Sequence, residues 1–143
     1  MPGMPGELRH PLPYASWETR GYWEGAGRGE LVLQRCGACG SVQHKPRAIC
    51  ATCLSDDLEH FVASGRGEVH TYTVTNQNQQ LPFRDSCPYV LAYVELEEGP
   101  RLLTNVVGVD PAEVRIGQAV VADYWAGERE DGEAIAVPRF RPA

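Results

Sequence analysis

The residues best suited to chemistry are two Cys-x-x-Cys pairs, Cys36 with Cys39 and Cys50 with Cys53, in the stretch RCGACGSVQHKPRAICATC. Ten residues separate the pairs, enough for a short hairpin to bring them together. Four thiolates at this spacing are the ligand set that structural Zn²⁺ prefers in tetrahedral geometry. Because four protein ligands leave no open position for a substrate, we predict a structural zinc site. A four-thiolate iron centre is the alternative.

The fifth cysteine, Cys87, lies far from this stretch, in RDSCPYV. A catalytic thiol needs a lowered pKa and a neighbouring base. Local sequence ties none of the four histidines to Cys87, so we interpret it as a buried or half-buried thiol at the start of a strand. The sequence also lacks the signatures of phosphate-binding loops, serine hydrolases, zinc proteases and dinucleotide-binding folds. An enzyme that works alone through Cys87 or its carboxylates is therefore only the third hypothesis.

Two other groups of residues are candidates for binding. Trp17, Tyr22 and Trp23 lie in SWETRGYWEGA, and tryptophan and tyrosine are typical anchors of protein interfaces. They either dock a partner or fold back on the surface of their own domain. Near the end of the sequence, Arg139 and Arg141 lie in VPRFRPA. They either contact a phosphate or an acidic partner, or belong to a strand that closes the fold with solvated arginines.

The elements that must position these residues begin with a short helix, predicted over residues 16–26. Ser16 is its expected N-cap, and Glu18 in the first turn complements the helix dipole. The region around the paired cysteines reads as short strands and turns with little material for a conventional core. Strands are expected at 31–35, 42–44 and 58–63.

From residue 67 onward the pattern changes to β-strands. YVLAYVEL, for example, places alternate residues on opposite faces of a strand. The five β-rich segments are EVHTYTVTNQ, YVLAYVEL, RLLTNVVGV, AVVADYWA and GEAIAVPRF. Five short strands with frequent turn signals favour a small Greek-key barrel of the OB type. The long polar connection NQNQQLPFRDSCP is a candidate functional loop.

Composition narrows the function classes. The chain has 143 residues and a formal net charge of −6, which suits one domain or a small domain with an appended module. OB-folds and zinc ribbons both bind single-stranded nucleic acid, so this is the second hypothesis. The acidic balance and the missing basic patch argue against it.

The sequence contains no window of about 18 apolar residues that would span a membrane. Its first residues, MPGMPGELRHPLPYA, lack an apolar core and are broken by prolines. We therefore predict a flexible lead-in rather than a signal peptide. Without a secretory signal, reduced thiols and a cytoplasmic location are expected.

Taken in order, these motifs resemble the DUF35 family, in which a rubredoxin-like zinc ribbon is fused to an OB-fold domain. The resemblance rests on YWEGAGRGELVLQRC, PYVLAYVELEEGPRLLTNVVG, VRIGQAVVADYW and VPRFRP. It implies a mainly β protein. The expected parts are a flexible N-terminus over 1–15, a helical docking segment over 16–29, a zinc ribbon over 30–64 and an OB-fold domain over 65–143.

The resemblance also implies a function. DUF35 subunits are non-catalytic partners of thiolase-superfamily enzymes, namely thiolases, acyltransferases or retro-aldolases that act on acyl-CoA thioesters, as in steroid side-chain or aromatic degradation. The expected partner is a thiolase-like or SCP2-like thiolase or aldolase subunit, in a heterotetramer or larger hetero-oligomer, with acyl-CoA nearby. The zinc ligands carry over onto the four paired cysteines. Docking through the three N-terminal aromatic residues and CoA-phosphate contact by the two C-terminal arginines are our own extension.

Overall fold

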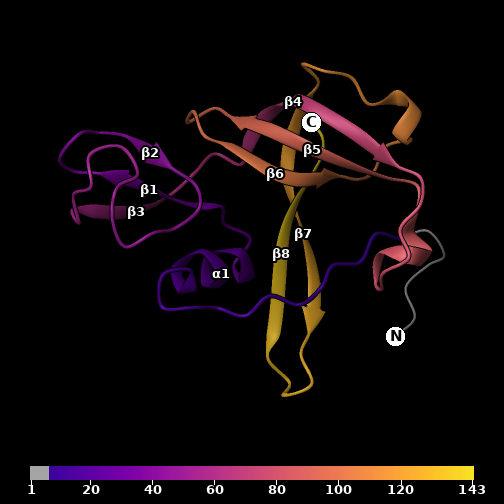
Figure 1. Cartoon of the computed structure of the whole chain (residues 1–143), viewed down its shortest axis with the longest axis horizontal. Coiled ribbons are helices and arrows are strands. Elements are labelled where there is room, and N and C mark those ends of the chain that lie inside the picture. Colours follow the sequence, from indigo (N-terminus) through magenta and orange to yellow (C-terminus); the bar gives the residue numbers. More distant parts are fainter. Residues whose placement is uncertain (1–6) are drawn as a thin grey trace.

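A helix, a three-stranded sheet and a closed five-stranded barrel follow one another along the chain (Figure 1). The computed structural model describes residues 7–143. Within this range no helix is long and apolar enough to cross a membrane. The helices are α1 (Arg20–Gly27) and the short 3₁₀ helices η1 (Phe83–Ser86) and η2 (Pro111–Glu113). The strands are β1 (Val32–Cys36), β2 (Val42–Gln43), β3 (Leu58–Val62), β4 (Arg66–Thr75), β5 (Tyr89–Leu96), β6 (Arg101–Val106), β7 (Ala119–Glu128) and β8 (Ala134–Pro142).

Helix α1 begins at Arg20, so the predicted start with Ser16 as N-cap is wrong. The backbone N–H of Ser16 donates to Oγ1 of Thr19 (2.9 Å), and the N–H of Thr19 donates to the carbonyl of Ser16 (3.2 Å). These bonds close a separate turn ahead of the helix, which leaves Glu18 outside the first helical turn. Thr19 takes the N-cap position without a side-chain hydrogen bond.

One face of α1 packs on the strand that follows it. The helix buries Tyr22, Gly25 and Ala26, which share a face at helical spacing. A Cβ atom at Gly25 would lie 2.3 Å from Cγ2 of Val32, so only glycine permits this close approach to β1. The helix also contacts β8, and it thereby joins the small sheet to the barrel.

The small sheet has the strand order β2-β1-β3, with both neighbours antiparallel to β1. We expected little hydrophobic core in this region, and this expectation is wrong for the residues in and next to β1. Leu31 and Leu33 are almost fully buried and belong to the same hydrophobic cluster as the barrel interior. The zinc-binding region is therefore continuous with the barrel core, and Tyr22 of α1 completes the junction.

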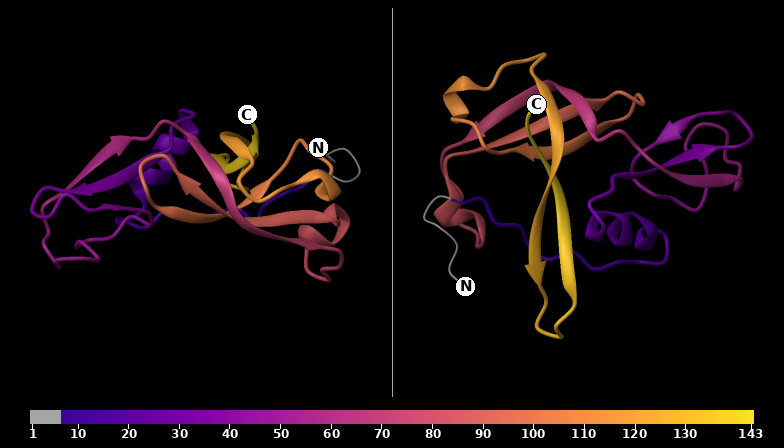
Figure 2. Two further views of the ribbon diagram at one scale, coloured as in Figure 1. Left: turned by 90° about the horizontal axis from the view of Figure 1, so that it is seen from above. Right: turned by 180° about the vertical axis from the view of Figure 1, so that it is seen from behind.

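The barrel has the closed order β4-β5-β6-β8-β7 and confirms the predicted five-stranded OB-fold. Closure uses a parallel contact between β6 and β8, where Val106 lies opposite Phe140. Along β5, buried and more exposed residues alternate, as the sequence pattern predicted. Phe140 is fully buried at the centre of the core. The β7–β8 hairpin continues well past the barrel, and Figure 2 shows it projecting from the body of the molecule.

Residues 7–15 run along this hairpin instead of forming the predicted flexible lead-in (Figure 1). Leu8 and His10 are buried. Nη1 of Arg139 donates to the carbonyl of Leu8 (3.0 Å), and the His10 ring meets the Trp125 ring edge-on at 5.4 Å. The arginine bond gives an extended segment a fixed position on β8. We call residues 7–15 the N-terminal strap.

The strap reaches the far end of the hairpin. The Arg129 guanidinium lies over the Tyr14 ring, 3.8 Å from its centroid, and donates to the carbonyl of Pro13 (3.4 Å). Stacking of this kind adds to the hydrogen bond at little entropic cost because the guanidinium is planar. The rest of the predicted flexible segment, residues 1–6, lies outside the described residues.

We predict that His10 makes stability fall in mild acid. Burial, aided by the Arg139 charge, lowers the pKa of His10 from 6.5 to about 4. The folded state thus binds this proton more weakly than the unfolded state, and the contribution is complete above pH 6.5 and lost as the pH falls toward 4. Between pH 7 and pH 5 the wild type should lose about 2 kcal/mol more than His10→Phe in urea unfolding. Equal losses in the two proteins would contradict the prediction. Because zinc loss affects both alike, only their difference is informative.

Candidate metal centre

Each Cys-x-x-Cys pair closes a tight backbone turn. In the first turn, the N–H of Cys36 donates to the carbonyl of Ser41 (2.9 Å), and the N–H of Gly40 donates to the carbonyl of Cys36 (2.9 Å). Gly40 has a φ of +75°, a left-handed conformation that glycine adopts without steric cost. The turn follows β1 directly, so its first cysteine is placed by the sheet.

The second turn repeats the two backbone hydrogen bonds of the first. The N–H of Cys50 donates to the carbonyl of Ser55 (2.8 Å), and the N–H of Leu54 donates to the carbonyl of Cys50 (3.0 Å). Leu54 takes the place of Gly40 and has a φ of +67°. A residue with a Cβ costs about 1 kcal/mol in this conformation. The Leu54 side chain is 70% exposed, so packing offsets little of that cost.

The two turns bring the four cysteine sulfurs together within 4.8 Å of one another. Sγ of Cys36 lies 3.6 Å from Sγ of Cys53, and Sγ of Cys39 lies 3.6 Å from Sγ of Cys50. A tetrahedral zinc site with its usual Zn–S bonds has sulfur–sulfur edges of about 3.8 Å. The donor set and its spacing therefore fit Zn²⁺. With four protein ligands the shell is closed, and the metal would supply structure and no reaction step.

Backbone N–H groups donate hydrogen bonds to two of the cysteine sulfurs. The N–H of Thr52 donates to Sγ of Cys50 (3.4 Å), and the N–H of Cys39 donates to Sγ of Cys36 (3.5 Å). Backbone N–H groups of Cys53 and Thr52 lower the pKa of the Cys50 thiol to about 6. This favours the thiolate of Cys50, which is the form that binds metal. In Cys39 and Cys53, backbone hydrogen bonds lower the pKa, but hydrogen bonds with the neighbouring thiols outweigh them and raise it.

Two buried glutamines hold the loop between the cysteine pairs, and the sequence analysis missed them. Nε2 of Gln43 donates to Oε1 of Gln34 (2.8 Å), which also accepts from the N–H of Arg47 (2.9 Å). Gln34 in turn donates to the carbonyl of Arg47 (3.0 Å), and Gln43 accepts from the N–H of Ala51 (2.9 Å). Pairing β1 with β2 would have revealed them, because the strand register places the two glutamines opposite each other.

The three candidate aromatic residues differ in how far they are exposed. Trp17 is 74% exposed in the turn before α1. Tyr22 is only 8% exposed, and its ring meets those of Trp23 and His44 edge-on at 4.9 and 5.3 Å. Trp23 is half-buried against the core. Of these three, Trp17 therefore has the most surface available to a partner.

The two candidate arginines lie on β8, the strand that closes the barrel. Arg139 is largely buried, and its Nε donates to Oδ2 of Asp123 (3.2 Å). Its charge is thus already balanced inside the protein. Arg141 is exposed, and its Nη1 donates to the neighbouring carbonyl of Pro142 (3.4 Å). Of the two, only Arg141 presents its guanidinium to solvent.

Cys87 is half-buried between η1 and β5, as predicted. Its thiol donates to the carbonyl of Phe83 (3.6 Å). This bond ties the sulfur to the first residue of η1 and provides no base. The structure gives Cys87 a local structural role.

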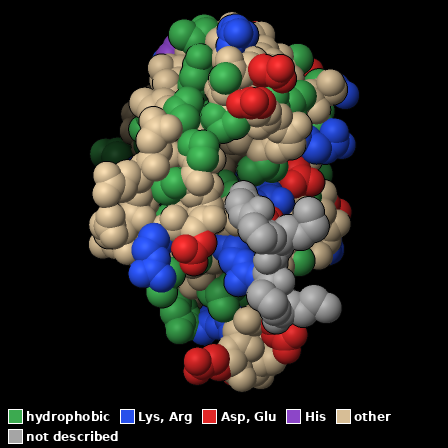
Figure 3. Space-filling view, turned by 90° about the vertical axis from the view of Figure 1, so that its right-hand side faces the viewer, with side chains coloured by type: hydrophobic (Ala, Val, Ile, Leu, Met, Phe, Trp, Pro, Cys, Tyr) green, Lys and Arg blue, Asp and Glu red, His purple; other side chains and the backbone are tan. Residues whose placement is uncertain are grey.

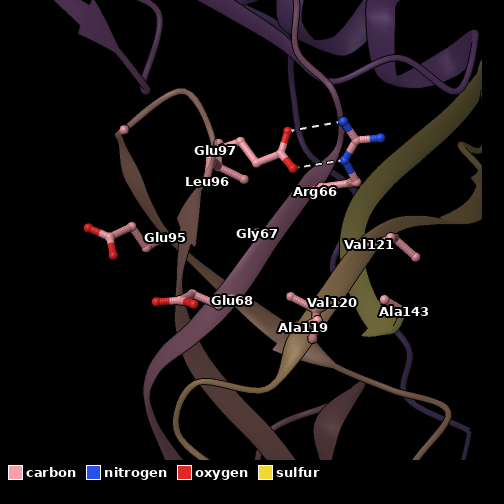
Figure 4. A pocket seen from close by; sticks show the side chains of 11 residues that line it. Arg66, Gly67, Glu68, Glu95, Leu96, Glu97, Ala119, Val120, Val121 and Ala143 are labelled. Atoms are coloured by element: carbon pink, nitrogen blue, oxygen red, sulfur yellow. Dashed lines mark hydrogen bonds and ion pairs between the residues drawn. The ribbon is translucent and has the colours of Figure 1, made fainter.

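A hollow of about 540 Å³ lies where β4 meets β5 and β7, and Figure 4 shows the side chains that line it. Arg66 and Glu97 form two hydrogen bonds across its upper edge, at 2.8 and 3.2 Å. This pairing raises the pKa of Arg66 and lowers the pKa of Glu97. Both side chains are exposed, so this is a surface ion pair between β4 and the turn after β5, not an acid–base pair.

The end of the molecule that carries η1 shows no concentration of one charge. In Figure 3, basic and acidic side chains are interspersed on this face among apolar ones. A surface that follows a nucleic-acid backbone has a basic stripe or patch. This face therefore lacks the surface that the second hypothesis requires.

Fold and metal site together define a zinc ribbon joined to an OB-fold barrel. Comparison with known families agrees: residues 23–59 match the "ChsH2, rubredoxin-like zinc ribbon domain" and residues 62–124 match the "ChsH2, C-terminal OB-fold domain". The chain is 39% identical over 119 residues to a "DUF35 domain-containing scaffold protein" of Methanothermobacter thermautotrophicus, covering 80% of this chain and 88% of that protein. The chain belongs to the DUF35 family.

Other relatives carry names connected with CoA enzymes. A "Probable enoyl-CoA hydratase alpha subunit" of Thermomonospora curvata is 39% identical over 97% of this chain, which spans 41% of that protein. The "Benzoylsuccinyl-CoA thiolase subunit BbsA" of Geobacter metallireducens is 32% identical over 52% of this chain and 48% of its own length. A solved structure, "Ltp2-ChsH2(DUF35) aldolase", has 38% identity and a TM-score of 0.77, covering 91% of this chain and 98% of that chain.

We predict that Leu54→Gly stabilises the protein. Glycine removes the steric cost of the left-handed backbone at this position, partly offset by its greater freedom when unfolded, so the free energy of unfolding should rise by up to about 1 kcal/mol. Leu54→Ala is the control, because it removes the same exposed side chain but keeps the Cβ. Denaturant unfolding in which glycine is no better than alanine would refute the strain at Leu54.

Loss of one zinc ligand should unfold the ribbon while the barrel stays folded. Cys50→Ser opens the four-thiolate shell, and the zinc-binding free energy at stake is on the order of 10 kcal/mol. We expect zinc content to fall and hydrogen exchange to accelerate between residues 36 and 53, with the β5 amides still protected. Cys87→Ser, outside the cluster, should keep its zinc. Full zinc content in Cys50→Ser would show that this cysteine is not a ligand.

Proposed function

We propose that this chain is a non-catalytic accessory subunit that binds and supports a thiolase-superfamily enzyme acting on acyl-CoA thioesters. The observation that carries the proposal is its match to a chain of the "Ltp2-ChsH2(DUF35) aldolase" at 38% identity over 98% of that chain. A relative named a thiolase subunit and one named a scaffold protein point the same way.

The arrangement of reactive groups supports a role without chemistry. The four-cysteine site is closed, and the Cys87 thiol is bound to a carbonyl. Arg66 is paired with Glu97. Among residues 7–143 we find no nucleophile within reach of a base that the fold could activate. The subunit would then act by shape, contributing a rigid surface to a site that another chain completes.

In this proposal the partner is a thiolase-like or SCP2-like subunit, and the assembly is a heterotetramer or larger. The partner's reaction is thiolysis, acyl transfer or retro-aldol cleavage of a CoA thioester. Trp17 is the exposed anchor of the docking segment. Arg141 is the candidate for CoA-phosphate contact, since its guanidinium is exposed. A four-thiolate site needs reduced cysteines, which supports a cytoplasmic location.

Coexpression tests the function directly. A thiolase-like protein encoded beside this chain should co-elute with it, and the complex should turn over an acyl-CoA substrate that neither component converts alone. Cys87→Ala in this chain should leave the turnover of the complex unchanged. A neighbour that is fully active alone and never co-elutes would reject the proposal. Tight, steeply salt-dependent binding of single-stranded DNA would favour the nucleic-acid hypothesis instead.

A further inference from the structure

A groove of about 660 Å³ lies where α1, the ribbon and the barrel meet. Its lining comes from three parts of the chain: residues 14–23, residues 44–47, and strands β6 and β8. Tyr22, Leu102 and Pro138 are buried among this lining. The groove has a rigid base because these residues belong to, or lie beside, the common core.

One wall of the groove carries two cations. Lys45 and Arg47 are exposed, and among residues 7–143 their side chains form no ion pair. Glu18, half-buried, is the acidic residue among those that line the groove. Burial lowers the pKa of His44 to about 4, so this neighbouring ring is neutral at physiological pH. In a chain with net charge −6, a wall with two unpaired cations is an unusual local charge.

The rim of the groove continues into an exposed apolar stripe on the barrel. Tyr14 and Leu103 line the groove and are largely exposed. Leu103, 54% exposed, lies opposite Tyr93, which is 45% exposed, and Leu91 follows two residues along β5, about 7 Å away. Trp17 is exposed and lies in the sequence between Ser16 and Glu18, which line the groove. Contiguous exposed apolar surface of this kind marks an interaction site, whereas single exposed residues do not.

The two cations and the apolar stripe together indicate what kind of molecule binds here. A small anionic molecule would fill the groove but leave Tyr93 and Leu91 uncovered. A second copy of this chain would bring its own Lys45 and Arg47 to the contact, and like charges oppose such pairing. A segment of another protein that carries apolar side chains beside a carboxylate satisfies both the stripe and the cations.

We infer that the groove, together with the stripe of Leu103, Tyr93 and Leu91, is the docking site for an acidic and apolar segment of the thiolase-like partner. This inference rests on the proposed function and adds the surface through which it operates. The carboxylate of the partner pairs with Lys45 and Arg47, and its apolar side chains cover the stripe. The zinc ribbon enters the interface by holding the cationic loop in place.

The test measures the affinity of the purified full chain for its thiolase-like partner at two salt concentrations. Leu103→Asp should weaken the dissociation constant roughly 30-fold, the loss typical of an interface anchor. Lys45→Glu combined with Arg47→Glu should weaken binding and reduce its salt dependence. Ile116→Asp and Arg84→Glu are matched controls, an exposed apolar and an exposed basic residue outside the groove, and should bind within about twofold of wild type.

Folding is controlled by zinc content and circular dichroism, and Tyr93→Asp provides a second stripe variant away from the groove and the ribbon. If folded Leu103→Asp and Tyr93→Asp bind like wild type, the docking site is wrong while the proposed function stands. If the wild type itself does not bind, both fall. Protein docking would be overturned if coenzyme A alone shifted the NMR signals of Lys45 and Arg47 in the isolated chain and the partner did not compete with it. A dimer of the isolated chain that Leu103→Asp disrupts would do the same.

Discussion

The convergence of four cysteine sulfurs on one point is the constraint on which the rest of the ribbon depends. Residues between the cysteine pairs form no regular structure beyond two residues of β2, so their backbone would lose its order without a cross-link. The metal shell closes this loop from one side, and the hydrogen bonds of Gln34 and Gln43 close it from the other. Lys45 and Arg47 lie in the loop that these two devices hold. A structural metal thus determines the position of charges on the surface.

Hydrophobic contact makes the ribbon and the barrel act as one body. Tyr22 of α1 and Leu31 and Leu33 beside it are buried in the same cluster as the barrel residues. Burying each of these side chains contributes roughly 1.5–3 kcal/mol. A ribbon attached by a flexible linker would present the groove in many geometries, and each would lower the affinity of a partner by the entropy of ordering it. The shared core removes that cost before binding.

The charged groups of the barrel also serve structure. Arg139 joins Asp123 on β7 to the backbone of Leu8, and Arg66 joins β4 to the turn after β5 through Glu97. The Arg139 guanidinium, largely buried between Asp123 and Leu8, could not bind a substrate without giving up these contacts. Leu103, Tyr93 and Leu91, in contrast, leave apolar surface exposed on the barrel. Charged side chains engaged within the protein, beside apolar side chains left exposed, are consistent with the proposed role as an accessory subunit.

The sequence by itself determined the cluster of four cysteines suited to zinc, the five barrel strands and the half-buried Cys87, because each depends on local spacing or on alternation within a few residues. It misplaced the start of α1, since the turn between Ser16 and Thr19 competes with helix at the same residues. It also could not separate Trp17 from Tyr22, or foresee the N-terminal strap. The bond between Arg139 and Leu8 joins residues at opposite ends of the chain. Only the tertiary structure brought such segments together, and it alone created the groove, because burial and contact there depend on packing between elements distant in sequence.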